Sequence, residues 1–301
     1  MSFWEGKRVV VTGGYGLIGT PMVRQLKSIG AEVLNMDLPQ YDVTSYSECL
    51  AVLEDKDICI HLAAVSHVED SRANPLSTYE VNVRGTWNIL EAARQQELGA
   101  VIIPSSNHVY GPQAQYPVKE TAKLNQMDTY SVGKICVDYI ARSYAHNYQL
   151  PVGIIRNTNC FGPNDPHSSH IVPSTILSML ANSLPTLQSL GTVKKGYLYV
   201  DDVVDAMLLV AQGLMNGVVP FGSVYNVGAP PINALDLASL IMGIMGMPNQ
   251  DPIILGKSND QASEQMDSTK IQALGWEPKW SLTEGLEATI QWFRQNAKVA
   301  V

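Results

Sequence analysis

The sequence has no long hydrophobic run and little positive charge. No apolar stretch approaches the about 18 residues that would suggest a membrane helix. Its 20 Lys and Arg residues are outnumbered by 28 Asp and Glu residues, which gives a formal net charge of −8. Nucleic-acid binding needs clustered Lys and Arg to neutralise phosphates, so this balance argues against a nucleic-acid partner. The sequence therefore predicts a protein that binds neither membranes nor nucleic acids.

Cysteine is also scarce. The four cysteines are Cys49, Cys59, Cys136 and Cys160. They form no Cys-x-x-Cys pair and show no spacing typical of a disulfide framework, so reduced thiols are expected. The strand-like run Val9-Val10-Val11 comes so early that it leaves no room for a signal peptide. These features predict a cytoplasmic protein.

Apolar residues, in contrast, make up 46% of the 301 positions. In the first 160 residues, short apolar runs alternate with helical patterns. The predicted strands are Lys7–Thr12, Glu32–Met36, Asp57–Leu62, Ala100–Pro104 and Val152–Arg156. The predicted helices are Leu17–Ile29, Ser45–Leu53, Leu76–Glu97 and Met127–Tyr148. This alternation predicts an α/β fold with a doubly wound, parallel (Rossmann) sheet.

After Gly162-Pro163, prolines separate shorter elements, which predicts a smaller α/β lobe. We expect a first domain over residues 1–165 and a substrate-binding lobe over residues 166–301. A helix beginning at Asp201 and a strand over Ser223–Val227 are expected to return to the first sheet. Parts of residues 197–228 would then complete the first domain, and the two lobes would interleave.

A glycine-rich turn follows the first predicted strand. Gly13 permits the tight turn, Gly16 lets a pyrophosphate approach the backbone, and Gly19 allows close packing of helix on strand. Asp37 follows the second predicted strand, where a carboxylate accepts hydrogen bonds from the adenosine ribose and repels a 2′-phosphate. The first domain is therefore predicted to bind a dinucleotide, with NAD favoured over NADP.

Tyr130 and Lys134 are four residues apart, on one face of a predicted helix. A free phenol has a pKa of about 10, and a neighbouring cation favours the phenolate. A phenolate can remove a proton from a sugar hydroxyl while a hydride leaves the same carbon. Together with the glycine turn and with Ser105-Ser106 at the end of the fourth predicted strand, the pair indicates a reaction site.

These motifs resemble those of the extended short-chain dehydrogenase/reductases, in the branch of NAD-dependent nucleotide-sugar epimerases and dehydratases. The resemblance covers nearly the whole chain. Besides the glycine turn and Tyr130-x-x-x-Lys134, it rests on Asp42-Val43, His61–Ala64, Asn82–Thr86, Ser105–Gly111, Arg156–Pro163 and Tyr199–Val204.

The resemblance implies that Tyr130 is the acid/base, that Lys134 tunes it and grips the nicotinamide ribose, and that Ser106 orients the reacting hydroxyl. It also implies that Asn159 contacts the diphosphate of a nucleoside-diphosphate sugar. The further residues expected to bind NAD are Tyr15, Leu17, Ile18, Asp42, Val43, Leu62, Ala63, Ala64 and Asn82, with Asp42 and Val43 flanking the adenine.

Two residues after Ser106 bear on the type of reaction. In 4,6-dehydratases similar to this chain, the matching positions are acidic or otherwise suited to eliminating water. Asn107 cannot supply a proton, which disfavours dehydration, although Ala63–Ser71 looks dehydratase-like. Asn107 is predicted to contact the substrate. His108 is either an acid/base group or a polar substrate contact.

His170 lies in a segment that resembles the one carrying a catalytic histidine in GDP-fucose synthase-like enzymes. Two interpretations stay open: a second acid/base group, which would allow epimerisation beside a 4-keto group, or a helix-start residue outside the site. His167 and His170 form a His-x-x-His pair, but no further ligand stands at zinc spacing, so no metal is predicted.

Lys195 and Lys257 stand where the family often has arginines that bind the substrate. Lysine binds phosphate as a point charge and cannot form a planar bidentate fork. Both lysines are predicted to bind the substrate diphosphate, and a substrate without a nucleotide stays open.

The predicted activity is that of an NAD-dependent nucleotide-sugar epimerase. Such an enzyme oxidises a sugar hydroxyl, usually at C4, and returns the hydride to the opposite face after the keto-sugar rotates. The alternatives are a sugar dehydrogenase, a 4-keto-sugar reductase or a 4,6-dehydratase of the same family. The intact Ser106, Tyr130 and Lys134 argue against an NAD-sensing protein without chemistry.

The two long predicted helices, Leu76–Glu97 and Met127–Tyr148, also predict a homodimer. In this family such a pair forms a four-helix interface with a second copy. The apolar residues that prompt this prediction are Trp87, Ile89, Leu90, Ile135, Val137 and Ile140.

Overall fold

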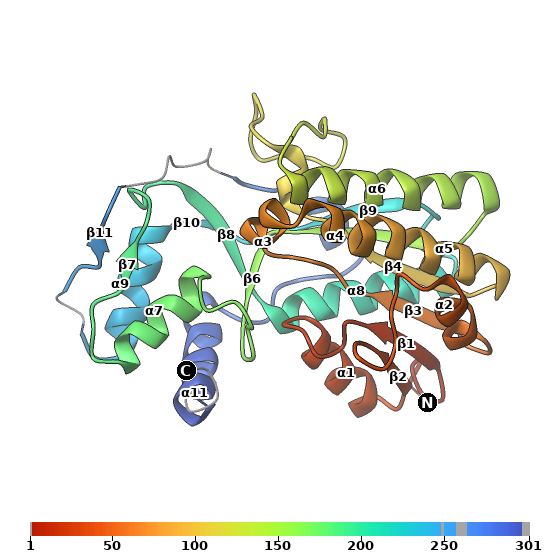
Figure 1. Cartoon of the computed structure of the whole chain (residues 1–301), viewed down its shortest axis with the longest axis horizontal. Coiled ribbons are helices and arrows are strands. Elements are labelled where there is room, and N and C mark those ends of the chain that lie inside the picture. The colour runs from red at the N-terminus through yellow and green to blue at the C-terminus, as the bar shows by residue number, and fades with distance from the viewer. Residues whose placement is uncertain (1, 248–249, 257–263, 297–301) are drawn as a thin grey trace.

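The structure is a computed structural model that describes residues 2–247, 250–256 and 264–296. Within these residues, a central six-stranded parallel sheet has the order β2-β1-β3-β4-β5-β9 (Figure 1). Its strands are β1 (Arg8–Thr12), β2 (Glu32–Met36), β3 (Ile58–His61), β4 (Ala100–Pro104), β5 (Val152–Asn157) and β9 (Ser223–Val227). The order runs outward in both directions from the β1–β3 pair, as in a doubly wound Rossmann sheet. The predicted fold class is therefore confirmed.

Helices cover both faces of this sheet because its strands are apolar on both sides. Every residue of β3 and β4 is buried. One face carries α1 (Gly19–Ser28) and α8 (Val200–Met215), which share one core with the sheet. The other face carries α2 (Tyr46–Leu53), α5 (Gly85–Gln95) and α6 (Thr129–Tyr148), which share a second core. With a helix layer packed on each face, the carboxyl ends of the parallel strands lie along one edge of the sheet.

A second region lies to the left of the sheet in Figure 1. It contains the sheet β10-β8-β6 and the strand pair β11-β7. The strands are β6 (Asn159–Phe161), β7 (Thr186–Leu187), β8 (Lys194–Tyr199), β10 (Pro231–Asn233) and β11 (Ile253–Ile254). The helices α7 (Ile171–Leu180), α9 (Ala234–Ile244) and α11 (Leu282–Asn296) share a third core there. The domain boundary at residue 165 stays a prediction.

The predicted helix Leu76–Glu97 is confirmed as a continuous helical stretch over Pro75–Gln95, although it contains a π-helical turn. The chain forms α3 (Val68–Ala73), α4 (Pro75–Tyr79) and a π-helical segment η1 (Glu80–Arg84) before α5. Within η1, the Asn82 amide makes two hydrogen bonds to the backbone of Val65, 2.7 and 2.9 Å long. The widened π-helical turn lies where the Asn82 side chain binds the loop after β3. Such turns often occur at functional sites.

The other predicted elements of the first 160 residues match the structure to within about two residues, as helix and strand ends commonly do. Two short helices complete the main layers: the 3₁₀ turn η2 (Asn107–Tyr110) after β4, and α10 (Thr269–Gln272) beside β9. Among the described residues, no helix has the length and apolar character needed to cross a bilayer.

Candidate active site

A cleft of about 930 Å³ opens at the carboxyl ends of the parallel strands. Ligands of doubly wound sheets bind at this edge, beside the point where the strand order reverses. The loops after β1, β2, β3 and β4 line one side of the cleft, and residues 157–173 with Lys195 and Tyr197 line the other. The cleft therefore lies between the main sheet and the second region.

The glycine turn after β1 is shaped by close backbone contacts. Gly13 has φ +66°, and a Cβ there would lie 2.8 Å from the backbone nitrogen of Ala63. A Cβ on Gly19 would collide with the Gly13 carbonyl oxygen. Only glycine fits at both positions, and Gly16 presents its backbone to the cleft without a side chain. This is the backbone cradle that a dinucleotide pyrophosphate requires.

A buried hydrogen-bonded chain holds the floor of this cradle. Thr12 Oγ1 accepts from the backbone N–H of Ala63 at 3.0 Å and lies 2.8 Å from His61 Nδ1. His61 Nε2 lies 3.1 Å from Thr86 Oγ1. Burial lowers the pKa of His61 to about 3, with a smaller contribution from Lys134, so this imidazole is neutral. The ring is a structural link between β3 and α5.

Asp37, at the end of β2, lines the same cleft. Its carboxylate accepts from the backbone N–H of Tyr15 at 3.1 Å and of Leu38 at 2.9 Å. These bonds fix the acid beside the glycine turn. A carboxylate in this place fits a ribose with free hydroxyls.

Most of the predicted cofactor residues line the cleft, and two do not. The lining includes Gly13, Gly16, Leu17, Ile18, Gly19, Asp37, Asp42, Val43, Leu62, Ala63, Ala64, Tyr130 and Lys134. The Tyr15 side chain is 72% exposed and does not line the cleft. The Tyr15 backbone N–H donates a hydrogen bond to the Asp37 carboxylate. Asn82 is buried and does not line the cleft itself. It accepts a hydrogen bond from the backbone N–H of Val65, which does line the cleft. Asp42 caps its own turn by accepting from the Thr44 N–H at 2.8 Å.

The predicted reaction group comes together where β4 ends against α6. Ser106, Tyr130 and Lys134 all line the cleft. Asp128 caps α6 by accepting from the Ser131 N–H at 3.0 Å, which sets the start of the helix that carries Tyr130. The Lys134 ammonium donates to the Pro104 carbonyl at 2.9 Å. Tyr130 also meets the His108 ring edge-on, with ring centroids 5.9 Å apart.

Burial dominates the electrostatics of this group. It raises the pKa of Tyr130 to about 12, although a hydrogen bond with Ser106 opposes the rise. It lowers the pKa of Lys134 to about 8. In the protein without ligand, loss of solvent outweighs the effects of neighbouring groups, so the pKa of Tyr130 lies above its ordinary value. That Lys134 stabilises the phenolate stays a prediction. Tyr130 is a phenol at neutral pH and can donate a proton.

His108 and Asn107 occupy the 3₁₀ turn η2. The Ser106 hydroxyl caps this turn by accepting from the His108 N–H at 3.1 Å. Burial lowers the pKa of His108, against opposing contributions from Glu264 and from a hydrogen bond to Asn159. His108 is therefore a neutral, half-buried ring that faces the cleft beside Tyr130 and Asn159. This position suits either of its two predicted roles.

The structure adds Glu264, which the sequence analysis missed. Its carboxylate accepts from the Asn107 amide and lies 3.6 Å from Lys195 Nζ. The backbone of Glu264 is fixed by a 2.8 Å hydrogen bond to the Lys194 carbonyl. The one available signal was Lys257, seven residues earlier, because its predicted contact with the substrate would bring this part of the chain near the cleft.

The remaining predicted residues fall in different places. Asn159 and Lys195 line the cleft, whereas Lys257 lies outside the described residues. His170 also lines the cleft, with Nδ1 2.9 Å from the buried Asp165 carboxylate. Its ring lies among His67 and His167.

A glycine cradle and a Ser-Tyr-Lys group at one edge of a Rossmann sheet define a dinucleotide-dependent enzyme of the extended short-chain dehydrogenase/reductase class. The chain belongs to the NAD dependent epimerase/dehydratase family, whose model matches residues 9–228. The resemblance inferred from the motifs is confirmed. NAD, the family's cofactor, fits this cleft: Gly13, Gly16 and Gly19 would hold its pyrophosphate, and Asp37 its adenosine ribose.

Curated relatives include both kinds of enzyme. The chain is 27% identical to a dTDP-D-glucose 4,6-dehydratase of Bos taurus, over 96% of this chain and 89% of the relative. It is 29% identical to a UDP-glucose 4-epimerase of Mycolicibacterium smegmatis, over 97% of this chain and 100% of the relative.

Solved structures divide in the same way. A UDP-glucose 4-epimerase of Thermotoga maritima, crystallised with UDP-glucose, matches with a TM-score of 0.89 and 26% identity, over 96% of this chain and 99% of that one. The dTDP-glucose 4,6-dehydratase DesIV of Streptomyces venezuelae, crystallised with NAD, matches with a TM-score of 0.88 and 26% identity, over 97% and 98%. The chain is thus an enzyme of this family.

Lys134→Met should change how stability depends on pH in the protein without cofactor. Between pH 8 and pH 10.5 the folded wild type binds fewer protons than the unfolded chain, because burial lowers the lysine pKa from 10.5 to about 8. The free energy of unfolding of the wild type should therefore rise with pH relative to the variant, by up to about 3 kcal/mol across this range. Denaturant unfolding of both proteins at several pH values measures the difference.

The exposed Lys123→Met is the matched control for this experiment. Its stability should follow that of the wild type at every pH. A constant difference between wild type and Lys134→Met from pH 8 to pH 10.5 would contradict the lowered lysine pKa.

Proposed function

We propose that the chain is an NAD-dependent nucleotide-sugar epimerase that acts through a transient keto-sugar. The observation that carries the keto-sugar chemistry is the grouping of Ser106, Tyr130 and Lys134 in the cleft that the glycine cradle also lines. Asn107, which cannot supply a proton, favours the epimerase over a dehydratase. A phenol, a hydroxyl and an ammonium in one cleft suit reversible oxidation of a secondary alcohol. NAD, when bound, supplies hydride acceptance and return.

The chain's own residues move and hold the proton. Ser106 orients the sugar hydroxyl toward Tyr130, whose phenolate oxygen takes the hydroxyl proton as the carbonyl forms. Lys134 stabilises that phenolate: its ammonium is already held beside the site by the Pro104 carbonyl. The positive charge of oxidised NAD, when bound, would also lower the pKa of the buried Tyr130 phenol. After the keto-sugar rotates, Tyr130 returns the proton to the carbonyl oxygen, and the hydride arrives on the other face.

The substrate's diphosphate is proposed to lie along the second region. Lys195 of β8 and Asn159 of β6 line that side of the cleft. The Lys195 ammonium is shared with Glu264 at 3.6 Å, so its charge toward a diphosphate is partly offset. This arrangement supports a nucleoside-diphosphate sugar bound with moderate electrostatic attraction.

Tyr130→Phe should reduce turnover at least about 100-fold, because general acid–base catalysis contributes about 10²–10⁴-fold. Ser106→Ala should cost less, since it removes an orienting hydrogen bond and leaves the proton acceptor in place. C4 epimerisation of UDP-glucose and of other UDP- and dTDP-sugars measures turnover, and NAD titration checks that cofactor binding survives.

Tyr116→Phe is the control, since it removes an equivalent hydroxyl from an exposed tyrosine outside the cleft lining. It should keep full turnover. Near-normal turnover of Tyr130→Phe with NAD bound would show that Tyr130 is not the acid/base, and His108 would be the next candidate.

A 4,6-dehydratase is a second candidate, and Glu264 is the observation that favours it. Dehydration needs a group that can give a proton to the departing hydroxyl, and Asn107 cannot. The structure brings the Glu264 carboxyl group into contact with the Asn107 amide and to the same end of η2 as His108. A carboxyl group is thus present at the place where the local sequence lacks one.

Glu264→Gln separates the two candidates. If the chain is a dehydratase in which Glu264 is the acid, the variant should form 4-keto-6-deoxy sugar at least about 100-fold more slowly. If it is an epimerase, the variant should keep C4 epimerisation within a few-fold. Product analysis with dTDP-glucose and UDP-glucose gives both rates, and the exposed Glu277→Gln serves as the control. A wild type that makes only the C4 epimer would rule out the dehydratase.

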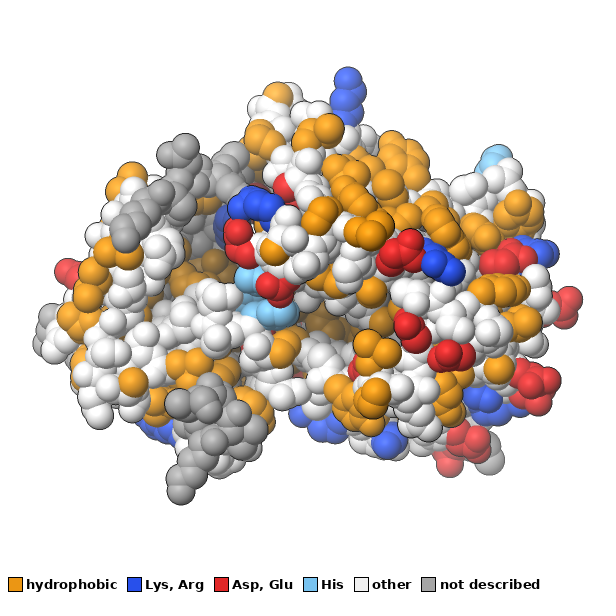
Figure 2. All heavy atoms as spheres, in the orientation of Figure 1, with side chains coloured by type: hydrophobic (Ala, Val, Ile, Leu, Met, Phe, Trp, Pro, Cys, Tyr) orange, Lys and Arg blue, Asp and Glu red, His pale blue; other side chains and the backbone are white. Residues whose placement is uncertain are grey.

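We also propose that two copies pair through α4, α5 and α6. Figure 2 shows hydrophobic side chains gathered over these helices, and Leu76, Trp87 and Tyr139 are 76%, 45% and 57% exposed there. Ile89, Leu90 and Val137, which helped to prompt the dimer prediction, are instead buried against the main sheet. The exposed face proposed for pairing therefore includes aromatic side chains such as Trp87 and Tyr139, in place of the buried aliphatic residues that prompted the prediction.

Trp87→Glu should convert the dimer into a monomer, because it places a charge within the proposed apolar interface. Light scattering at micromolar concentration measures the mass of the particle. Val218→Glu, at an exposed position beyond the end of α8, should remain a dimer. A monomeric wild type would contradict the proposal.

A further inference from the structure

Three histidine rings from distant parts of the sequence meet in the cleft wall. His67 precedes α3, and His167 and His170 lie in the loop between β6 and α7. The His67 and His167 rings are stacked with centroids 4.9 Å apart, and the His170 ring lies 4.9 Å from His167 and 5.5 Å from His67. Figure 2 shows histidine side chains gathered in the hollow between the two regions.

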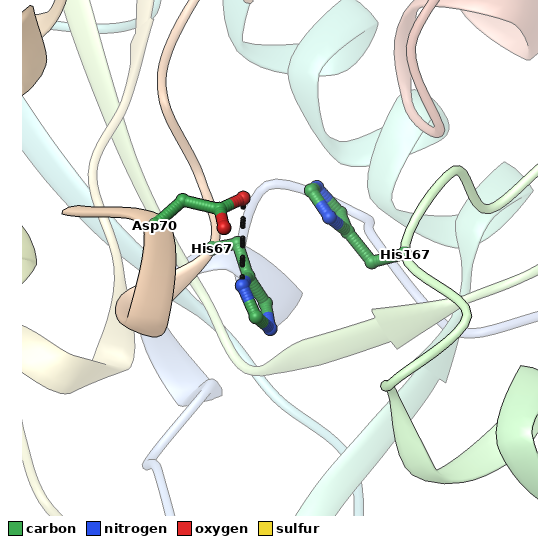
Figure 3. Close-up of side chains that lie close together, drawn as sticks. All are labelled: His67, Asp70 and His167. Carbon is green, nitrogen blue, oxygen red and sulfur yellow. Dashed lines mark ion pairs between the residues drawn. The ribbon is translucent and has the colours of Figure 1, made fainter. Parts of the chain in front are cut away.

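An acidic side chain faces this group. Asp70 Oδ2 lies 3.5 Å from His67 Nδ1, and Figure 3 shows the carboxylate directed at that nitrogen. His67 Nδ1 is buried, yet it has no hydrogen-bond partner. One ligand atom each from His67, Asp70 and His167 lie within 4.8 Å of one another.

A serine hydroxyl lies near one ring nitrogen of each of these two histidines. His67 Nε2 is 3.1 Å from Ser169 Oγ, which fixes the ring and directs Nδ1 toward Asp70. His167 Nε2 lies 3.5 Å from Ser66 Oγ. A histidine that binds a metal through one nitrogen commonly uses the other in a hydrogen bond of this kind.

We propose that His67, Asp70 and His167 form a binding site for a divalent transition-metal ion of the Zn²⁺ type. Two imidazoles and one carboxylate are a donor set that zinc accepts, with further positions left for water. Tetrahedral ligands at about 2.1 Å from zinc lie about 3.4 Å apart, so side-chain shifts of less than about 1 Å would close the present spacing.

This site would join the two sides of the cleft. His67 and Asp70 belong to the loop and helix that follow β3 of the main sheet, whereas His167 belongs to the loop after β6 of the second region. The pattern His167-x-x-His170 drew attention to a pair within one loop. The actual partners of His167 are about a hundred residues away in the sequence, so spacing could not reveal them.

The test is metal binding by the full chain without a histidine tag, after dialysis against a chelator. Calorimetric titration with Zn²⁺ should show one ion per chain, and Co²⁺ should give the visible absorption of a nitrogen- and oxygen-ligated ion. Loss of outer-shell partners alone weakens metal sites about 10–100-fold, so His67→Ala and His167→Ala should each weaken Zn²⁺ binding at least about 100-fold. Asp70→Asn should weaken it at least about 10-fold.

His146→Ala is the matched control, because His146 is an exposed histidine on the last turn of α6. It should bind Zn²⁺ as the wild type does. His67→Gln and His167→Gln repeat the test with polar replacements in case an alanine variant fails to fold, which circular dichroism reports.

The proposal is overturned if the wild type takes up no stoichiometric Zn²⁺. It is also overturned if folded His67 and His167 variants bind as tightly as the wild type, or if His146→Ala loses the ion equally. None of these readouts requires turnover, so the result stands whichever reaction the enzyme performs.

Discussion

The arrangement of the reaction site depends on the buried ion pair between Arg156 of β5 and Asp138 of α6. Their side chains are 1% and 0% exposed and share two hydrogen bonds of 2.8 and 2.9 Å. Asp138 follows Lys134 by about one helical turn, so the pair fixes the reactive end of α6 on the sheet. The same guanidinium donates to the Tyr110 hydroxyl at 2.8 Å, which ties η2 to this pair. Removing one partner of a buried pair costs about 3–5 kcal/mol, so the attachment of α6 to β5 resists disruption.

The features that the sequence predicted correctly are local ones. Strands such as Ala100–Pro104 are short apolar runs between turn signals, and nothing outside the run is needed to recognise them. The cradle at Gly13 and Gly19 likewise follows from a strand, a turn and a helix that are continuous in the chain. Tyr130 and Lys134 share a helix face for the same reason. Each of these predictions requires only residues that are close together in the sequence.

The features that were missed depend on contacts across the fold. Glu264 meets Asn107 over 157 residues, and no spacing rule connects them. The π-helical turn within the helix predicted over Leu76–Glu97 lies where Asn82 binds the loop after β3, a partner that helical periodicity does not show. The raised pKa of Tyr130 could not be predicted because the motif reveals the nearby lysine but not the depth of burial. The helices and strands can thus be predicted from local sequence patterns, whereas the contacts and pKa values of the site depend on residues far apart in the sequence and on burial.

The two sides of the cleft divide the work between them. The main sheet supplies the cofactor cradle and the hydroxyl, phenol and ammonium that reversible oxidation of an alcohol needs. This equipment serves an epimerase and a dehydratase equally, which fits the similar identities of 29% and 27% to relatives of each kind. On the side of the second region, Asn159 and Lys195 line the cleft, and Glu264, from the segment that follows β11, lies 3.6 Å from the Lys195 ammonium. The motifs that define the family therefore supply what both reactions share, and contacts from outside these motifs, such as that of Glu264 with Asn107, are where the two reactions would differ.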